Sequence, residues 1–299
     1  MPISQYIKEI GRGKNGARAI SREQAADLFG QVLDGTVSDL EIGAFCLAMR
    51  IKGETTQEMA GFLDATYPRL QRLPATTRPM VVLPSYNGAR KLPVLTPLLA
   101  LLLAREGLPV LMHGTVTEQS RIPSSNVSLA LGIKELSAIR VIANGEVAFA
   151  PTELLCPGLK RLLDVRRVVG LRNPAHSLVK LINPCVGKSL LVTSYTHPEY
   201  AASMSAVLSL LKSNALLLRG TEGEVVANAR RMPQMDAIIA GKHVTLQDSE
   251  LHASSIELPT SIDAASTSAW IRSVLDGHTP APAPIARQVQ VVLQLVERL

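Results

Sequence analysis

The chain has 299 residues, a length that suits two domains. Hydrophobic residues make up 46% and charged residues 19%, a balance that excludes a disordered chain. The formal net charge of +6 favours acidic partners: nucleic acid, an anionic membrane surface or a phosphate-bearing small molecule. Aromatic residues are only 3%, so any contact with nucleic acid should be mainly to phosphate rather than by stacking on bases.

Metal, disulfide and membrane classes are also disfavoured. The cysteines Cys46, Cys156 and Cys185 are odd in number and far apart, so neither a disulfide framework nor a zinc site is predicted. The longest apolar run, residues 98–104, is shorter than the roughly 20 residues that span a bilayer. The N-terminus does not have the pattern of a signal peptide. We therefore expect a soluble, cytoplasmic protein with no membrane contact.

The first 70 residues predict a bundle of four short helices. An apolar stripe at helical spacing marks the first of them. Capping boxes that start at Ser21 and Ser38 begin the second and third helices. Either Thr55 or Thr56 caps the fourth.

The pattern changes after a linker at 73–79, where Pro and Thr gather. Apolar runs at 80–83 and 109–112 flank a helical stretch at 96–106, which is the pattern of a βαβ unit and predicts a parallel sheet. Further strands are predicted at 189–193, 215–218 and 237–240, a helix at 201–213, and two helices within 261–299.

The positive charge is concentrated in one segment. Residues 156–190 carry seven Lys and Arg side chains against one acid, Asp164, an excess equal to that of the whole chain. On a helical wheel over 159–169, Lys160, Asp164 and Arg167 share one face. Arg161 lies at the edge of that face, and Arg166 lies on the apolar side.

A charged face of this kind has two interpretations. In most proteins it is simply solvated, and Arg166 would then snorkel or pair with a buried acid. The alternative is a footprint for the phosphates of a polyanion, read without reference to the bases. Arg172, His176 and Lys180 continue at i+4 spacing beyond the helix and would extend that footprint.

Several segments are similar to the superfamily of anthranilate phosphoribosyltransferases and nucleoside phosphorylases. Residues 20–70 resemble its helical N-terminal domain, 109–114 the strand and turn of its Lys-His-Gly-Asn motif, and 172–184 a later segment that ends in Asn-Pro. The nearest likeness is to the YbiB-type branch, which is regarded as binding nucleic acid. Its signatures are resembled by residues 194–200, 218–224 and 282–288.

The resemblance implies the fold. A large α/β domain with a mostly parallel central sheet would comprise residues 80–151 and 185–299. A separate all-helical domain would be discontinuous, formed by residues 1–73 and an insertion at about 152–184. Homodimers would form through the helical domain, and the positively charged segment would lie in the insertion, beside the cleft between the domains.

The resemblance also implies that the family's site for phosphoribosyl diphosphate has degraded. The turn at 83–90 keeps one glycine and lacks the acid, and residues 92–96 have lost most hydroxyl and amide donors. The Lys and Asn of the Lys-His-Gly-Asn motif are replaced by Met112 and Thr115. The adjacent Asp-Glu pair that holds Mg²⁺ is absent from residues 222–224 in any register. The anthranilate-binding arginine is kept, at Arg166.

Four remaining residues have two interpretations each. His113 is as suited to a satisfied turn histidine as to a ligand contact. Glu222 and Glu224 could hold a cation, but acids at such positions more often cap a helix N-terminus. Arg219 lies at the end of a predicted strand, at the edge where open α/β sheets bind ligands, and a phosphate contact and a plain surface arginine are equally compatible with this position.

The sequence therefore predicts a non-catalytic homodimer that binds DNA and RNA without sequence preference and needs no cofactor or metal. Two alternatives stay open: a phosphoribosyltransferase or phosphorylase-like enzyme acting on a phosphorylated sugar or nucleotide, and a phosphate sensor without turnover. The predicted nucleic-acid contacts are Lys160, Arg161, Arg166, Arg167, Arg172, Lys180, Arg219, Arg230 and Arg231. The predicted remnant of a ligand pocket comprises Asn87, Gly88, His113, Gly114 and Glu222.

Overall fold

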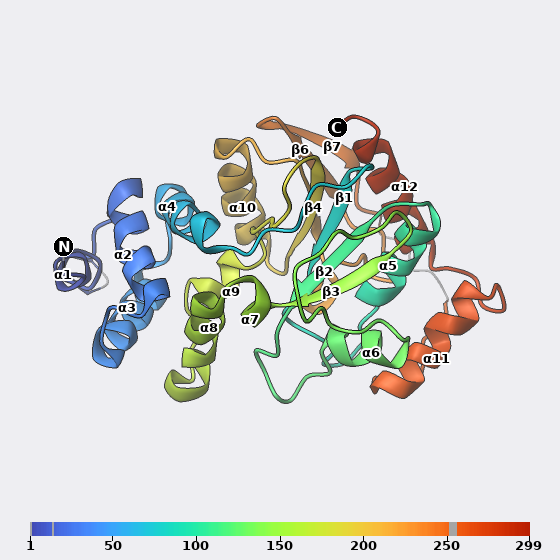
Figure 1. The fold of residues 1–299 in the computed structure, drawn as a ribbon, viewed down its shortest axis with the longest axis horizontal. Coiled ribbons are helices and arrows are strands. Elements are labelled where there is room, and N and C mark those ends of the chain that lie inside the picture. Colours follow the sequence, from blue (N-terminus) through green and yellow to red (C-terminus); the bar gives the residue numbers. More distant parts are fainter. Residues whose placement is uncertain (1, 14, 251–255) are drawn as a thin grey trace. The chain divides into compact units, whose positions relative to one another are not determined.

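The computed structural model describes residues 2–13, 15–250 and 256–299, and the chain divides into two compact units (Figure 1). The helical unit comprises Met1–Gln71 and Thr152–Pro184, and the α/β unit comprises Arg72–Pro151 and Cys185–Leu299. Each unit is therefore built from two separate stretches of chain. The sequence places the corresponding boundaries at residues 73, 152 and 184.

The helical unit begins its longer helices with reciprocal caps. The Ser21 hydroxyl accepts from the Gln24 N–H at 3.2 Å, and the Gln24 side chain accepts from the Ser21 N–H at 2.9 Å. Ser38 and Thr55 form the same boxes, so Thr55 rather than Thr56 is the cap. Each box satisfies two N–H groups at a helix end. The elements are α1 (Ser4–Ile10), α2 (Arg22–Asp34), α3 (Asp39–Lys52), α4 (Thr56–Thr66), the 3₁₀ turn η1 (Tyr67–Arg69), α7 (Thr152–Leu155), α8 (Pro157–Val169) and α9 (Ala175–Leu178).

Three phenylalanines form the centre of the helical unit. Phe29 of α2 stacks on Phe62 of α4 with ring centroids 4.7 Å apart, and Phe45 of α3 meets both rings edge-on. All three are fully buried. Helix α8, from the second stretch of chain, packs against α2 and buries Leu159, Leu162 and Leu163, so the distant segment completes the bundle.

The α/β unit is organised around one sheet. Over the described residues the sheet has seven strands in the order β3-β2-β1-β4-β5-β6-β7. Strands β1 to β5 pair in parallel, whereas β6 pairs in antiparallel fashion with both β5 and β7, which confirms a mostly parallel sheet. The strands are β1 (Met80–Pro84), β2 (Val110–Gly114), β3 (Val147–Pro151), β4 (Ser189–Tyr195), β5 (Ala215–Arg219), β6 (Met235–Ile239) and β7 (Lys242–Gln247).

Alternate residues of the strands build the main core. Val81 and Leu83 of β1 pack with Leu98 of α5 and Val292 of α12 in one buried cluster, as the two-residue period of a strand requires. Helix α10 packs against β4, β5 and β6. The helical elements of this unit are α5 (Thr96–Arg105), α6 (Ser124–Ala130), α10 (Pro198–Leu210), the 3₁₀ turn η2 (Thr221–Gly223), α11 (Ala264–Leu275) and α12 (Ala283–Val296).

The strand order positions the candidate site. From β1 the chain proceeds to β2 and β3 on one side, and β4 and β5 lie on the other side of β1. Ligands of open α/β sheets bind at the carboxyl ends of the strands where the order reverses, here at β1 and β4. The loop that follows β1 and the loop that follows β5 meet at this edge. No helix in the described part of the chain is both long enough and apolar enough to cross a membrane.

Candidate functional site

The loop after β1 lies directly against the end of β2. A Cβ atom on Gly114 would come within 1.9 Å of the Ser85 carbonyl oxygen, so only glycine allows this approach. His113 precedes it within β2 and is fully buried. Its Nδ1 shares a hydrogen bond of 2.8 Å with the Tyr86 hydroxyl. His113 is therefore positioned by the loop, and it belongs to the strand rather than to a turn.

The carboxylate of Glu224 is buried within the same loop. One oxygen accepts from the backbone N–H groups of Asn87 and Gly88, both at 2.8 Å. Glu224 is 2% exposed, and charge-assisted hydrogen bonds of this kind offset the desolvation of a buried carboxylate. The other oxygen accepts from three side-chain hydroxyls, those of Ser85, Thr96 and Ser124.

A second carboxylate, that of Glu222, holds the next part of the loop. It accepts from the backbone N–H groups of Arg90 at 2.7 Å, Lys91 at 3.0 Å and Leu92 at 3.4 Å. Glu222 adopts a φ of +53°, which is uncommon for a residue other than glycine and costs free energy. The hydrogen bonds to the loop maintain this conformation.

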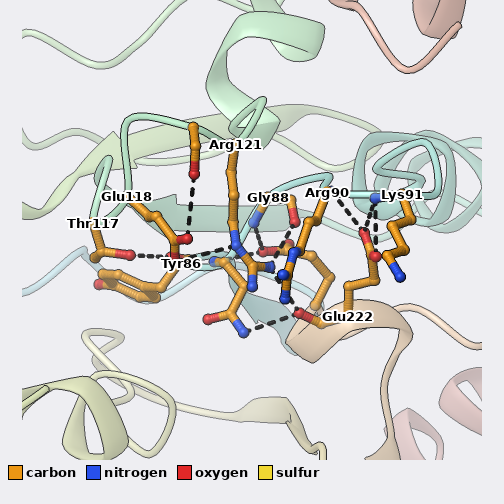
Figure 2. Close-up of polar contacts among 11 residues, drawn as sticks. Tyr86, Gly88, Arg90, Lys91, Thr117, Glu118, Arg121 and Glu222 are labelled. Atoms are coloured by element: carbon orange, nitrogen blue, oxygen red, sulfur yellow. Dashed lines mark hydrogen bonds and ion pairs between the residues drawn. The ribbon is translucent and has the colours of Figure 1, made fainter.

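Arg121 fills the space between these segments (Figure 2). Its guanidinium donates to the carbonyl oxygens of Gly88 and Glu222, each at 3.4 Å, and forms an ion pair with Glu118 at 3.3 Å. The cavity that remains beside this arginine has a volume of about 10 Å³. This is room for about one water molecule.

The two glutamates therefore bind the protein's own loop, neither capping a helix nor facing an open metal site. The expectation that they cap a helix N-terminus is wrong, because the N–H groups they accept belong to residues 87–92, ahead of α5. Hydrogen-bond donors already engage both oxygens of each carboxylate, so these residues do not fit the Mg²⁺ ion that the fold family implies. Nowhere in the described chain do three or more His, Cys, Asp or Glu residues form a group that could hold a metal.

The basic residues of α8 have different local roles. Lys160 forms an ion pair with Asp164, which also lies 3.5 Å from the Arg167 guanidinium. The Arg167 side chain remains 51% exposed. Arg161 donates to the carbonyl oxygen of Leu33 at 2.8 Å, at the C-terminal end of α2. Cationic groups are stabilising at helix C-termini, so Arg161 has a structural role that the sequence pattern does not show.

Beyond α8, positive charges gather around one histidine. Burial and then the positive charges of Arg172 and Arg166 lower the pKa of His176 to about 4. His176 is therefore neutral near pH 7, while the two arginines beside it are charged. Arg172 is exposed, and Arg166 and Lys180 are half-buried. The structure thus brings Arg166, Arg172 and His176 together within the helical unit.

The predicted contacts in the α/β unit lie in two places. Arg219 is exposed at the end of β5 and pairs in register with Tyr195 of β4. Arg230 and Arg231 are exposed in the segment before β6 and line a separate pocket with Leu92. Of the predicted remnant pocket, Asn87 and Gly88 lie in the loop after β1 (residues 85–95, called the filled loop below), and His113 and Gly114 lie at the end of β2 beside it. Glu222 follows β5 and accepts N–H groups of the filled loop.

Sequence reasoning missed Tyr86 and Arg121, which occupy much of the site, and the hydroxyl ring around Glu224. Their partners lie up to 139 residues away along the chain. A backbone N–H donor leaves no trace in a sequence pattern. The available signal was a pair of acids, Glu222 and Glu224, that follow the predicted strand at 215–218. It coincides with the loss of the acid from the turn at 83–90.

Comparison with known proteins agrees with this geometry. Residues 4–67 match the helical bundle domain of the glycosyl transferase family. The crystal structure of anthranilate phosphoribosyltransferase from Thermus thermophilus matches with a TM-score of 0.72 and 22% identity, over 95% of this chain and 85% of that one. The helical bundle and the mostly parallel sheet thus define a protein with the anthranilate phosphoribosyltransferase fold.

The sequence relatives identify the family more narrowly. The uncharacterized protein YbiB of Escherichia coli K12 is 39% identical over 300 residues, which cover 98% of this chain and 94% of that protein. Anthranilate phosphoribosyltransferase of Methanosarcina acetivorans is 30% identical over 232 residues, covering 76% of this chain and 61% of that enzyme. The chain belongs to the family of YbiB.

Proposed function

We propose that this protein is a cytoplasmic homodimer that binds DNA and RNA without sequence preference and has no phosphoribosyltransferase activity. Lys and Arg side chains would contact phosphates, chiefly from α8 and the segment that follows it. The observation that carries the proposal is the cluster around His176, where Arg172 and Arg166 lie close enough for their positive charges to lower the pKa of the histidine. Such a cluster attracts a polyanion and releases counterions when phosphates replace them.

The filled loop supports the absence of transferase activity. A phosphoribosyl diphosphate would need open N–H groups and an open metal site after β1. Here Glu222 and Glu224 accept those N–H groups, and the adjacent cavity holds about 10 Å³. To bind this substrate, the carboxylates of Glu222 and Glu224 would both have to leave the N–H groups from which they accept hydrogen bonds.

The exposed face of α3 supports a homodimer. Leu40, Leu47 and Ile51 are 84%, 46% and 58% exposed, and their spacing of seven and then four residues places them on one side of the helix. Several exposed apolar side chains in one stripe are typical of a protein interface. Because the related fold implies dimers through the helical domain, we propose a second copy of this chain as the partner of this face.

A salt series tests the nucleic-acid proposal. Fluorescence anisotropy should give similar dissociation constants for two unrelated oligonucleotides of equal length. The logarithm of the affinity should fall linearly with the logarithm of salt concentration, with a slope of about −0.9 per neutralised phosphate on duplex DNA and about −0.7 on single strands. A slope near zero, or no binding at low salt, would overturn the proposal.

Two further measurements test its other parts. Titration with phosphoribosyl diphosphate and Mg²⁺ should show no saturable binding, whereas Mg²⁺-dependent binding would favour the transferase alternative. Light scattering should give the mass of a dimer, and Leu47→Asp should shift it toward the monomer because a charge in a buried interface is costly. An unchanged mass for this variant would exclude the α3 face.

A further inference from the structure

The α/β unit contains a second pocket that is separate from the filled loop. It has a volume of about 200 Å³, twenty times that of the cavity beside Arg121. Leu92, Pro93, Leu95, Val226 and Leu258 supply apolar walls. The polar side chains that line it are those of Thr221, Asn228, Arg230 and Arg231. The pocket thus combines an apolar body with several hydrogen-bond donors at its rim, as small-molecule sites do.

The charge of this pocket is uncompensated. Among the described residues, no acidic side chain lines it. Within that same part of the chain, neither Arg230 nor Arg231 forms an ion pair. The Nε atom of Arg230 donates to the Ile256 carbonyl oxygen at 3.3 Å, which orients that guanidinium. Two guanidinium groups without a counterion present a local charge of +2 to a ligand.

Thr221 provides an independent observation. Its hydroxyl oxygen is buried and has no hydrogen-bond partner among the described residues, although its backbone N–H donates to the Val226 carbonyl oxygen at 3.0 Å. Leaving a buried hydroxyl unpaired costs free energy. Thr221 also lines the pocket, and rotation of its side chain would bring this hydroxyl to a ligand, which would supply the missing partner.

The pocket walls are held in place from the protein side. The buried Gln288 side chain donates to the Val225 carbonyl oxygen and accepts from the Ala227 N–H, both at 2.8 Å. Asn228 accepts from the Arg230 N–H at 2.9 Å, and Glu222 accepts from the Leu92 N–H at 3.4 Å. A pocket fixed in this way binds a ligand at a smaller entropic cost.

We infer that this pocket binds a phosphomonoester. Such a group carries a charge of about −1.5 to −2 near pH 7 and three acceptor oxygens, which matches two guanidinium groups and the adjacent hydroxyl and amide. A carboxylate has a single charge and two oxygens, so it would leave part of this set unpaired. The volume limits the organic part to a compact group that packs on Leu92, Pro93 and Leu258.

Titration calorimetry with phenyl phosphate at constant ionic strength tests the inference. We expect saturable binding of one molecule per chain, at least fivefold tighter than that of inorganic phosphate because the ring covers the apolar wall. Arg231→Ala should weaken this binding at least tenfold. Arg231 has no side-chain hydrogen bond or ion pair in the described chain, so its removal should leave the fold intact, and thermal unfolding verifies this.

Arg298→Ala is the matched control, since it removes one exposed arginine of the same unit that does not line the pocket. It should leave the affinity for phenyl phosphate within twofold. The inference is overturned if phenyl phosphate does not bind, if it binds no better than inorganic phosphate, or if Arg298→Ala weakens binding as much as Arg231→Ala.

The source of the phosphate is found by competition. A dinucleotide with a 5′-phosphate should displace phenyl phosphate if the pocket receives the end of a nucleic-acid chain, and its 5′-hydroxyl form should not. If neither competes, the pocket serves a small organic phosphate. This result is independent of the salt series on oligonucleotides, so the pocket and the proposed function can fail separately.

Discussion

The carboxylate of Glu222 accepts the backbone N–H of Arg90 at 2.7 Å, across 132 residues of sequence. The same carboxylate also accepts from the Lys91 N–H (Figure 2) and from the Leu92 N–H. A carboxylate of the protein therefore accepts hydrogen bonds from three neighbouring N–H groups at the carboxyl ends of the strands. This arrangement ties the loop after β1 to the loop after β5.

Replacing this carboxylate should release the loop. Glu222→Gln removes the charge and turns an amide NH₂ group toward N–H donors, so we expect a loss of about 1–3 kcal/mol in the free energy of unfolding. Urea denaturation measures the loss, with an unchanged slope if the unfolded state is unaffected. Hydrogen exchange should also become faster at the amides of residues 90–92.

The matched control for this variant is Glu199→Gln, because Glu199 is exposed in the first turn of α10. It should shift the unfolding midpoint far less than Glu222→Gln does. Equal stability of Glu222→Gln and the unmodified chain would show that the three N–H contacts do not hold the loop.

Two arginines of α8 should separate a structural role from a binding role. Arg161→Ala removes the donor to the Leu33 carbonyl oxygen and should cost about 1 kcal/mol of stability. Arg167→Ala, at an exposed side chain, should change stability by less than about 0.5 kcal/mol. The same variant should weaken binding of unrelated oligonucleotides equally and reduce the salt slope by about 1. The reverse pattern in unfolding and anisotropy would contradict this assignment.

His176 predicts a pH dependence of stability. Its pKa is lowered to about 4 in the folded chain, below its ordinary value of about 6.5. Between these values the unfolded chain binds a proton that the folded chain does not, so the free energy of unfolding falls as the pH is lowered through this window. The total loss from this group is about 3 kcal/mol.

Denaturation in urea at pH 7, 6, 5 and 4 measures this dependence. His176→Gln should reduce the slope of stability against pH, because its side chain does not titrate. His278→Gln replaces an exposed histidine and should keep the slope of the unmodified chain. Identical slopes for all three proteins would rule out a proton linkage at His176.

The parts of the fold that the sequence predicts are those set by local chemistry. Ser21 and Ser38 predict the starts of two helices, because each cap and its reciprocal partner lie three residues apart. The buried strands β1 and β2 are visible as short apolar runs. By contrast β7 was not predicted, since its first four residues are exposed and only two of its residues, Val244 and Leu246, are apolar.

The site is less predictable because its partners are distant and many are backbone groups. The helical wheel places Arg161 at the edge of a charged face, but no pattern identifies the Leu33 carbonyl oxygen as its partner. The family resemblance locates the loop at 83–90, yet the acids that fill it follow β5 and lie more than 130 residues further along the chain. Residue types indicate which groups are available, whereas the strand order decides which of them meet.

Thr221→Val should weaken ligand binding without lowering the stability of the fold. Valine has nearly the shape of threonine but lacks the hydroxyl that is buried without a described partner. Since no hydrogen bond within the described protein is lost, stability should stay within about 0.5 kcal/mol of the unmodified chain or increase, because an unpaired buried hydroxyl is removed. Phenyl phosphate should nevertheless bind at least threefold more weakly in calorimetry. A clear loss of stability would mean that the hydroxyl serves the fold rather than a ligand, and an unchanged affinity would exclude it from the pocket's contacts.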